Sequence, residues 1–405
     1  MRRLVQILFW SVISAAFIGP GTVTTAALAG AAHGPGLLWA LAFSTVACLV
    51  LQEASARLTI VSGRDLGQAI RERFRGGALG ATVPVFVLGA VVLGCAAYEA
   101  GNILGGVAGA VLGTGLPRGW LTLGAGVFAF VLLWLGTTRT VSQVLGVVVA
   151  FMGVVFLVTA ARLGPEPYDL IRGALVPRLP PGSSLLVVGL IGTTVVPYNL
   201  FLGSGIARGQ TLGEMRFGLS VAVVLGGVIS MAVLVVGTAV DPPLAFDGLA
   251  RALRARLGGW AESFFAYGLL AAGLSSAITA PLAAAVAARS LLSRPGRTGA
   301  ATAGPAWPER SWRFRSVWLL VLLTGIGFGL AEVRPVPAII LAQALNGLLL
   351  PFVAVFLLLV VNDVRLMGRK GLNGRFSNAA LCVVVAVTVL LGGLGVTRAL
   401  ASAAG

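Results

Sequence analysis

The chain has 405 residues, of which 58% are hydrophobic and 10% are charged, and its formal net charge is +16. About a quarter of the residues of an ordinary soluble domain are charged, so this composition excludes a soluble globular protein and indicates a polytopic membrane protein. The basic excess does not indicate a nucleic-acid partner, because the arginines lie in short connections between apolar segments.

Eleven apolar segments are long enough to cross a membrane as helices, which takes about 20 residues. The N-terminal run is longer than a signal peptide and is followed by further spans, so it is taken as the first span. The sequence therefore predicts an all-α integral membrane protein with a single transmembrane domain over residues 1–405. The predicted spans lie at about 7–32, 36–61, 79–113, 120–138, 142–162, 184–207, 217–240, 261–292, 316–333, 336–361 and 377–400.

The arginines in the connections predict the orientation of the chain. Most of the 29 lysines and arginines fall on the side of the membrane that holds the N-terminus, and cytoplasmic loops carry the basic excess. The sequence thus predicts a cytoplasmic N-terminus and an outer C-terminus in a bacterial-type plasma membrane. Residues 293–315 are expected to form a flexible cytoplasmic loop, and residues 241–260 an amphipathic helix on the outside.

Two features inside the spans predict packing rather than chemistry. Three cysteines lie within apolar spans, where they are expected to act as small core hydrophobes without a disulfide. The third span has a glycine every four residues, a pattern that lets helices pack closely. No nucleotide-binding loop is present in the sequence, so ATP hydrolysis is not expected. Enzymatic activity of other kinds is not expected either. The cysteines are Cys48, Cys95 and Cys382, and the glycines are Gly101, Gly105, Gly109 and Gly113.

Two spans are interrupted near their middle by a proline beside small residues. In a bilayer, an unwound helix exposes backbone N–H and C=O groups, which is tolerated only where they line a cavity or bind a ligand. A pair of such breaks in corresponding positions of two halves indicates the substrate site of a transporter. We therefore expect the substrate at the bilayer midplane, between the first and sixth spans. The residues of the two breaks are Gly19, Pro20, Gly21 and Thr22 in the first, and Thr193, Thr194, Val196, Pro197, Tyr198 and Asn199 in the second.

Two carboxylates lie inside predicted spans, where an ionisable side chain is costly and usually functional. Glu53 is in the second span and Glu99 is in the third, so either is a candidate to carry a coupling proton. The alternative for Glu53 is a structural ion pair with Arg57, one helical turn away. His33 follows the first span and is expected to be a loop residue.

Several segments, in the right order along nearly the whole chain, resemble the Nramp family (natural resistance-associated macrophage protein). The resemblance implies the leucine-transporter fold, in which two inverted repeats of five helices precede one extra helix and helices 1 and 6 are discontinuous. It also implies import of divalent metals such as manganese and iron together with protons. The resembling segments are 51–66, 196–202, 268–276, 341–352 and 363–368. The implied repeats are 1–162 and 184–361, and the extra helix is 377–400.

The side chains that hold the metal in the family are replaced here. The family's Asp-Pro-Gly-Asn corresponds to Gly19-Pro20-Gly21-Thr22, and its methionine before the second proline corresponds to Val196. Its histidine after that proline is here Tyr198, and the alanine whose carbonyl binds the metal is here Thr193. The first break therefore lacks the carboxylate that the family uses.

Two further positions follow from the resemblance. An acidic residue linked to the family's proton route aligns with Asn102, one turn after Glu99. Gln343 matches a polar residue near the metal and is retained. Asn102 is therefore added to the candidates for coupling, and Gln343 to those for substrate binding.

The neutral breaks favour a different cargo from that of the family. A divalent ion that leaves water needs anionic or strongly polar ligands, whereas hydroxyls, amides and free helix ends suit a small polar organic solute. We expect an amino-acid-like solute, moved by alternating access and coupled to protons. The alternatives are a divalent-cation transporter with a degenerate site, and a receptor or scaffold that has lost transport. No cofactor, ATP or nucleic acid is expected, the bilayer is the surrounding partner, and the oligomeric state stays open.

Overall fold

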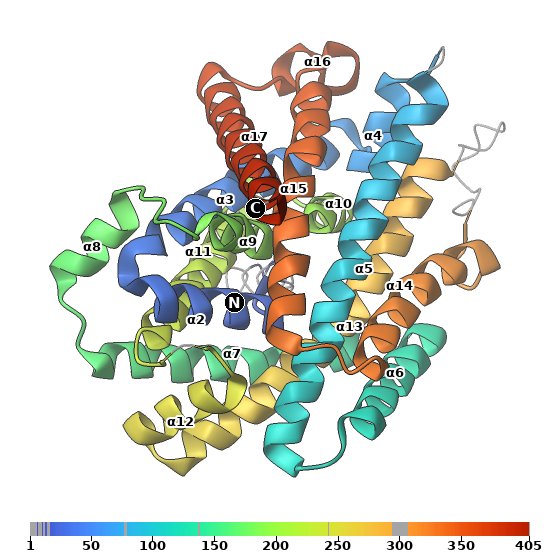
Figure 1. Cartoon of the computed structure of the whole chain (residues 1–405). Coiled ribbons are helices and arrows are strands. Elements are labelled where there is room, and N and C mark those ends of the chain that lie inside the picture. Colours follow the sequence, from blue (N-terminus) through green and yellow to red (C-terminus); the bar gives the residue numbers. More distant parts are fainter. Residues whose placement is uncertain are drawn as a thin grey trace.

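Every element in the described part of the chain is a helix (Figure 1). The computed structural model describes residues 6, 10, 13, 17–76, 79–136, 138–241, 243–293 and 307–404. The helices are α2 (Pro20–His33), η1 (Gly34–Leu37), α3 (Leu38–Ser62), α4 (Leu66–Arg73), α5 (Leu79–Thr114), α6 (Arg118–Leu135), α7 (Thr138–Leu163), α8 (Pro167–Leu175), α9 (Ser184–Thr194), α10 (Pro197–Ile206), α11 (Leu212–Gly237), α12 (Phe246–Leu257), α13 (Gly259–Leu292), α14 (Trp312–Leu330), α15 (Pro335–Val361), α16 (Val364–Gly371) and α17 (Arg375–Ala404).

Ten helical segments of the described residues are long and apolar enough to cross a membrane. They coincide with the predicted spans to within a few residues at most ends. The first of them, Pro20–Ser62, joins the second half of span one to span two through η1. Most of the first half of span one lies outside the described residues, as do residues 294–306 of the predicted cytoplasmic loop. The division into two repeats and an extra helix stays a prediction.

The two long helices α5 and α13 pack against each other through glycines. A Cβ atom at Gly109 would lie 2.6 Å from the carbonyl oxygen of Ala266, and one at Gly106 would lie 3.1 Å from the Cα of Gly273. Distances this short leave no room for a side chain, so the absence of a Cβ is what lets the backbones approach.

Of the four predicted glycines, Gly109 packs closely on α13, and a Cβ atom at Gly105 would overlap Pro20 of α2. Gly101 and Gly113 have room for a Cβ atom at ordinary contact distance.

The amphipathic helix expected between residues 241 and 260 is α12. Leu249 and Leu253 are buried on its inner face, whereas Arg251 and Arg254 are exposed. Its apolar face is covered by contacts with α13 and α7. The expected amphipathic helix is confirmed, with Leu249 and Leu253 buried by protein and Leu257 half-buried. Its location on the outer side stays a prediction.

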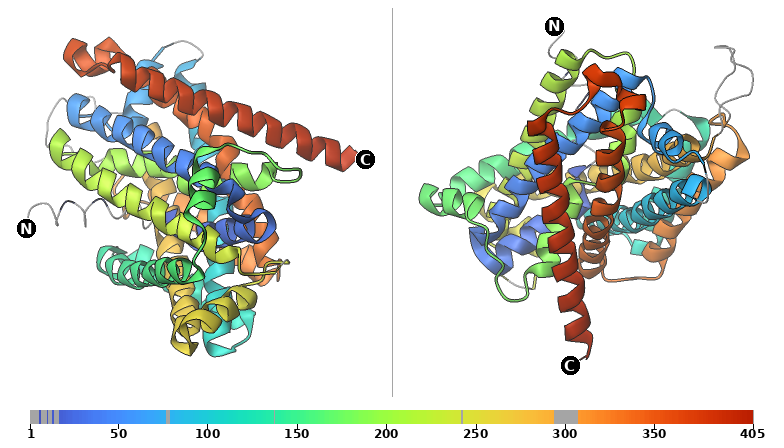
Figure 2. Two further views of the ribbon diagram at one scale, coloured as in Figure 1. Left: turned by 90° about the vertical axis from the view of Figure 1, so that its left-hand side faces the viewer. Right: turned by 90° about the horizontal axis from the view of Figure 1, so that it is seen from above.

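The expectation for the cysteines holds for two of the three. Cys48 and Cys95 are buried, but Cys382 is exposed on α17, so the expectation that it is a core residue is wrong. The reason is the position of α17, which lies along the edge of the bundle (Figure 2, left). One face of this helix has no neighbour within the described residues, and an apolar residue there is exposed to lipid.

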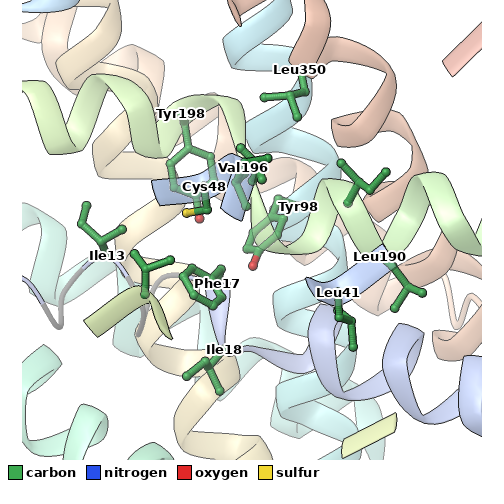
Figure 3. Packing of buried hydrophobic residues seen from close by; sticks show 14 of the residues in the cluster. Ile13, Phe17, Ile18, Leu41, Cys48, Tyr98, Leu190, Val196, Tyr198 and Leu350 are labelled. Carbon is green, nitrogen blue, oxygen red and sulfur yellow. The ribbon is translucent and has the colours of Figure 1, made fainter. Parts of the chain in front are cut away.

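The two breaks lie in the apolar core of the bundle. Phe17 and Val196, which border the breaks, are at most 1% exposed and belong to the largest buried cluster. Figure 3 shows both residues close to Tyr98 and Tyr198 in the middle of the molecule. The fold therefore places two stretches of irregular backbone where no water is available.

Candidate functional site

The first break interrupts the helical backbone between Phe17 and Pro20. Gly19 is extended (φ −133°, ψ −172°), and α2 begins again at Pro20. A proline suits the first turn of a helix, where its missing N–H is not needed, but it cannot continue a helix that precedes it. The carbonyl oxygen of Phe17 accepts hydrogen bonds from the Gly19 N–H (3.1 Å) and from the Thr22 hydroxyl. The side chain of Thr22 thus satisfies backbone that the break exposes.

The second break has the same construction. α9 ends at Thr194, and α10 begins at Pro197 after the non-helical residues Val195 and Val196. Val196 is extended (φ −83°, ψ 126°). In both breaks the second half-helix therefore starts with a proline and directs the N–H groups of its first turn toward the core. Such helix N-termini attract anionic groups and carbonyl or hydroxyl oxygens.

The two breaks meet at a pair of hydroxyl groups. The Oγ1 atoms of Thr22 and Thr193 lie 2.8 Å apart, and both side chains are at most 1% exposed. The single hydroxyl proton of Thr22 is already donated to the Phe17 carbonyl. Thr193 is therefore the donor, and Thr22 is the acceptor. This hydrogen bond joins the two breaks, and the sequence had named Thr22 and Thr193 as candidates without pairing them.

Several buried polar atoms near the breaks have no hydrogen-bond partner among the described residues. They include both amide atoms of Asn199, the Oε1 of Gln343 and the Oγ of Ser276. All three side chains are 1% exposed. A buried polar group without a partner costs about 1–3 kcal/mol, so native proteins rarely leave one unexplained. Such a group of atoms is expected where water or a ligand binds.

The glycines of the first break do not border open space. A Cβ atom at Gly21 would overlap the side-chain amide of Gln343, and one at Gly19 would lie 3.3 Å from the Oγ of Ser276. Glycine has no side chain and is expected to leave room for a ligand to reach the backbone. In this conformation that expectation is wrong, because the space beside Gly19 and Gly21 is occupied. The reason is that α15 and α13 pack directly on the break and fill the space with their own polar side chains.

Glu99 and Asn102 form a buried pair on α5. The Nδ2 of Asn102 donates a hydrogen bond of 3.2 Å to the Oε2 of Glu99, whose Oε1 has no partner among the described residues. The neighbouring Tyr98 packs edge-to-face on Tyr198 with ring centroids 5.6 Å apart. The sequence proposed Glu99 and Asn102 separately, and the structure joins them by this hydrogen bond. The side chain of Glu99 lies against α14, where a Cβ atom at Gly325 would be 2.7 Å from its Cγ.

Glu53 lies elsewhere, in a cluster of charged side chains. It pairs with Arg57 on the same helix at 3.2 Å and with Arg216 of α11 at 2.7 Å. This arrangement agrees with the alternative of a structural ion pair. The structure does not bring Glu53 to the breaks.

Some residues near the site were not singled out from the sequence. Ser276 and Tyr98 both lie beside Gly19; the available signal was a polar side chain inside an otherwise apolar span. Thr194, a candidate from the sequence, uses its hydroxyl within its own helix, where it donates a hydrogen bond of 3.1 Å to the Leu190 carbonyl. His33 is the last residue of α2 and is half-buried.

Carboxylates are scarce around the breaks. Within the described ranges, no group of three or more His, Cys, Asp and Glu side chains could hold a metal ion. The residues of the two breaks themselves, 17–22 and 193–199, supply hydroxyl, amide and carbonyl oxygens and no carboxylate. That donor set is neutral.

Comparison with protein families matches residues 11–398 to the family model described as natural resistance-associated macrophage protein-like. The divalent metal cation transporter MntH of Deinococcus radiodurans is 29% identical, over 97% of this chain and 90% of the relative. MntH of Acidiphilium cryptum is also 29% identical, over 94% of this chain and 88% of the relative.

Comparison with solved structures supports the fold. A manganese transporter of Eremococcus coleocola, solved as a mutant, superposes with a TM-score of 0.75 at 21% identity, over 98% of this chain and 87% of that chain. Mhp1, a nucleobase-cation-symport-1 family transporter, superposes with a TM-score of 0.57 at 14% identity, over 97% of this chain and 92% of that chain. The architecture is thus the leucine-transporter type that the sequence predicted.

Proposed function

The chain belongs to the Nramp family of membrane transporters, and on that basis we propose that its cargo is a divalent metal cation. The two MntH relatives, which match nearly the whole chain, are divalent metal cation transporters. This proposal reverses the preference drawn from the neutral breaks, which favoured an organic solute. The function is transport and not enzymatic catalysis.

The observation that supports placing this cargo at the breaks is the hydrogen bond between Thr193 and Thr22. It brings the oxygens of both breaks to one point in the core, close to the unpartnered Oε1 of Gln343. A site that both discontinuous helices share is one that a relative movement of the two can open to either side. Since Thr22, Thr193 and Gln343 are at most 1% exposed, the helices have to move for cargo to enter.

The neutral oxygens define the kind of cation that suits the site. Hard cations such as Mg²⁺ and Mn²⁺ bind hydroxyl, amide and carbonyl oxygens, whereas softer metals favour sulfur or imidazole ligands. Without a carboxylate, these oxygens offset only part of the cost of dehydration. We therefore propose that the cation keeps part of its water shell, binds weakly, and is a hard ion rather than a soft one.

A second candidate is a small polar organic solute. It is favoured by Asn199, whose buried amide offers both an unpartnered donor and an unpartnered acceptor. A cation can use only the acceptor, whereas an organic solute with a carbonyl or amino group can use both. The two candidates share the same place in the fold and differ in the charge of the cargo.

Uptake into proteoliposomes separates the two candidates. The purified chain is reconstituted and tested with Mn²⁺, Mg²⁺, Cd²⁺ and a panel of amino acids. Saturable uptake of Mn²⁺ or Mg²⁺, with weaker uptake of Cd²⁺, is expected. Saturable uptake of an amino acid without any metal uptake would overturn the proposal in favour of the second candidate.

A variant at Gln343 tests whether the breaks hold the cargo. Gln343→Met keeps the length of the side chain but removes its amide, so the KM for the transported ion should rise about tenfold with little change in expression. Gln210→Met, in the connection before α11, is the matched control and should behave as the wild type. An unchanged KM in Gln343→Met would place the cargo elsewhere.

A proton is proposed as the coupling ion, and Glu99 as its carrier. Glu99 is fully buried, one of its carboxyl oxygens has no partner among the described residues, and it lies beside the tyrosine that contacts Tyr198. A buried carboxyl group on the helix that contacts the second break through Tyr98 can be loaded with a proton on one side of the membrane and release it on the other.

A further inference from the structure

A cleft of about 440 Å³ opens between α3, α11 and α17, away from the two breaks. All three helices are candidate membrane spans, and α3 contacts both of the others. Figure 2 (left) shows them side by side, with α17 at the edge of the bundle. A cleft between membrane helices at the edge of the bundle opens toward lipid. Most of its walls are apolar, and they include Leu49, Val50, Leu219 and Leu381.

The cleft contains a charged group at one end. The Oε1 of Glu53 accepts hydrogen bonds from the Nε (3.0 Å) and the Nη2 (2.7 Å) of Arg216. Its Oε2 accepts a hydrogen bond of 3.2 Å from the Nε of Arg57. Two guanidinium groups therefore share one carboxylate, and the cluster has a net positive charge.

The two arginines differ in how much of their hydrogen-bonding capacity is used. Arg57 is 8% exposed in its side chain and also donates to the Gly371 carbonyl and to the Asn373 side chain. Arg216 is 56% exposed in its side chain and makes hydrogen bonds only to Glu53 among the described residues. A guanidinium has five N–H donors, so three of those on Arg216 remain for a ligand. Arg57 and Glu53 hold Arg216 in place, and Arg216 faces the opening.

The charged end of the cleft lies near one surface of the membrane. Arg216 is in the second turn of α11, and Phe376 is the second residue of α17. Phe376 lines the rim and is 94% exposed. Leu49 precedes Arg57 by eight residues on α3, or about 12 Å along the helix axis. The apolar walls therefore extend from the charged end into the hydrocarbon region.

We propose that this cleft binds one anionic glycerophospholipid. Its phosphate is bound by Arg216, and an acyl chain lies along Leu49 and Val50, which line the cleft and are partly exposed. Guanidinium groups form strong charge-assisted hydrogen bonds with phosphate, and basic pockets between membrane helices select anionic head groups. The apolar walls beside Arg216 favour a lipid over a soluble phosphate, because a soluble phosphate would leave these walls uncovered. The inference does not depend on the identity of the cargo.

Native mass spectrometry of the full-length protein tests the proposal. The protein in detergent is titrated with equal amounts of phosphatidylglycerol and phosphatidylcholine of the same chain length. Wild-type protein is expected to retain one phosphatidylglycerol in preference to phosphatidylcholine. Arg216→Gln should lower that preference about fivefold, whereas Arg313→Gln, an exposed arginine at the start of α14, should leave it unchanged.

A second pair of variants tests the cleft independently, in case Arg216→Gln does not fold. Ser220→Trp should fill the cleft and prevent retention of either lipid, while Leu225→Trp, exposed on the same helix but outside the cleft, should retain phosphatidylglycerol. Size-exclusion profiles identify the variants that fold. Unchanged preference in folded Arg216→Gln, or unchanged retention in folded Ser220→Trp, would overturn the proposal. Displacement of the lipid by millimolar inorganic phosphate alone would also overturn it, because the site would then select a free anion.

Discussion

The hydroxyl of Thr193 donates a hydrogen bond of 2.8 Å to the hydroxyl of Thr22, across 171 residues of sequence. The direction of this bond follows from the second one, in which Thr22 donates its own proton to the Phe17 carbonyl. Thr22 therefore forms hydrogen bonds to both breaks. It satisfies backbone exposed in the first break and accepts the bond that ties the second to it.

Removing the Thr193 hydroxyl should destabilise this conformation, in which the two breaks are bonded to each other and buried. Thr193→Val keeps the shape of the side chain but removes the donor to Thr22, which should lower the free energy of unfolding by about 1 kcal/mol. We expect a lower melting temperature and a changed uptake rate. Thr159→Val is the matched control, since that hydroxyl is equally buried but bonds only to a carbonyl of its own helix. Equal effects of the two variants on uptake would contradict a special role for the bond between the breaks.

A single methyl group at Gly21 should block transport. The Cβ atom of Gly21→Ala would overlap the side-chain amide of Gln343, so the first break could not close on α15. We expect uptake by Gly21→Ala to fall at least tenfold. Gln343→Ala in the same chain should make room for the methyl group and restore uptake only to the level of Gln343→Ala alone, which lacks the amide for the cargo. Gly205→Ala, in α10, has no atom near the added methyl group and should transport normally. Normal uptake by Gly21→Ala would show that the closed arrangement is not part of the transport cycle.

Proton coupling should depend on Glu99 and not on Glu53. Glu99→Gln cannot take up or release a proton, so its uptake should lose the acceleration by an inward proton gradient that we expect of the wild type. In Glu53→Gln that acceleration should remain, because Glu53 forms ion pairs with Arg57 and Arg216 outside the site. The measurement is uptake into proteoliposomes with and without a pH gradient. Full acceleration in Glu99→Gln would exclude it as the proton carrier.

The contact between α5 and α13 should tolerate no side chain. Gly109→Val would bring methyl groups against the Ala266 carbonyl, which a Cβ alone would already approach to 2.6 Å. Overpacking of this kind costs about 1–3 kcal/mol or more, so the melting temperature should fall by several degrees. Gly124→Val, on α6, has no neighbouring atom at the added Cβ and is the control. A melting temperature for Gly109→Val equal to that of Gly124→Val would show that the helices can separate freely.

Much of the fold could be predicted because membrane spans are apolar along their whole length. Hydropathy alone located the helices that are long enough to span a membrane, but not the short helices α4, α8 and α16. The prolines Pro20 and Pro197 located both restarts. These are local signals, since a proline has the same effect on a helix whatever surrounds it. The amphipathic helix α12 was predictable for the same reason.

The contacts of the site could not be predicted from local signals. Gly21 suggested free space, but whether space exists depends on α15, which is more than 300 residues away in the sequence. In the sequence Glu53 is a carboxylate within an apolar span, and its ion pair with Arg216 depends on another helix, α11. The local sequence also favoured an organic cargo, because the residues of the first break include no carboxylate. The similarity to metal transporters over the whole length is a different kind of observation.

The contact between Gly21 and Gln343 has a consequence for the membrane as a barrier. With the glutamine amide lying where a Cβ would otherwise be, a cargo that binds beside Gly21 exchanges places with a part of the protein. Between cycles the midplane then contains side chains and no open passage. A transporter built in this way can return without cargo and still keep water and small ions from leaking along the path that the cargo takes.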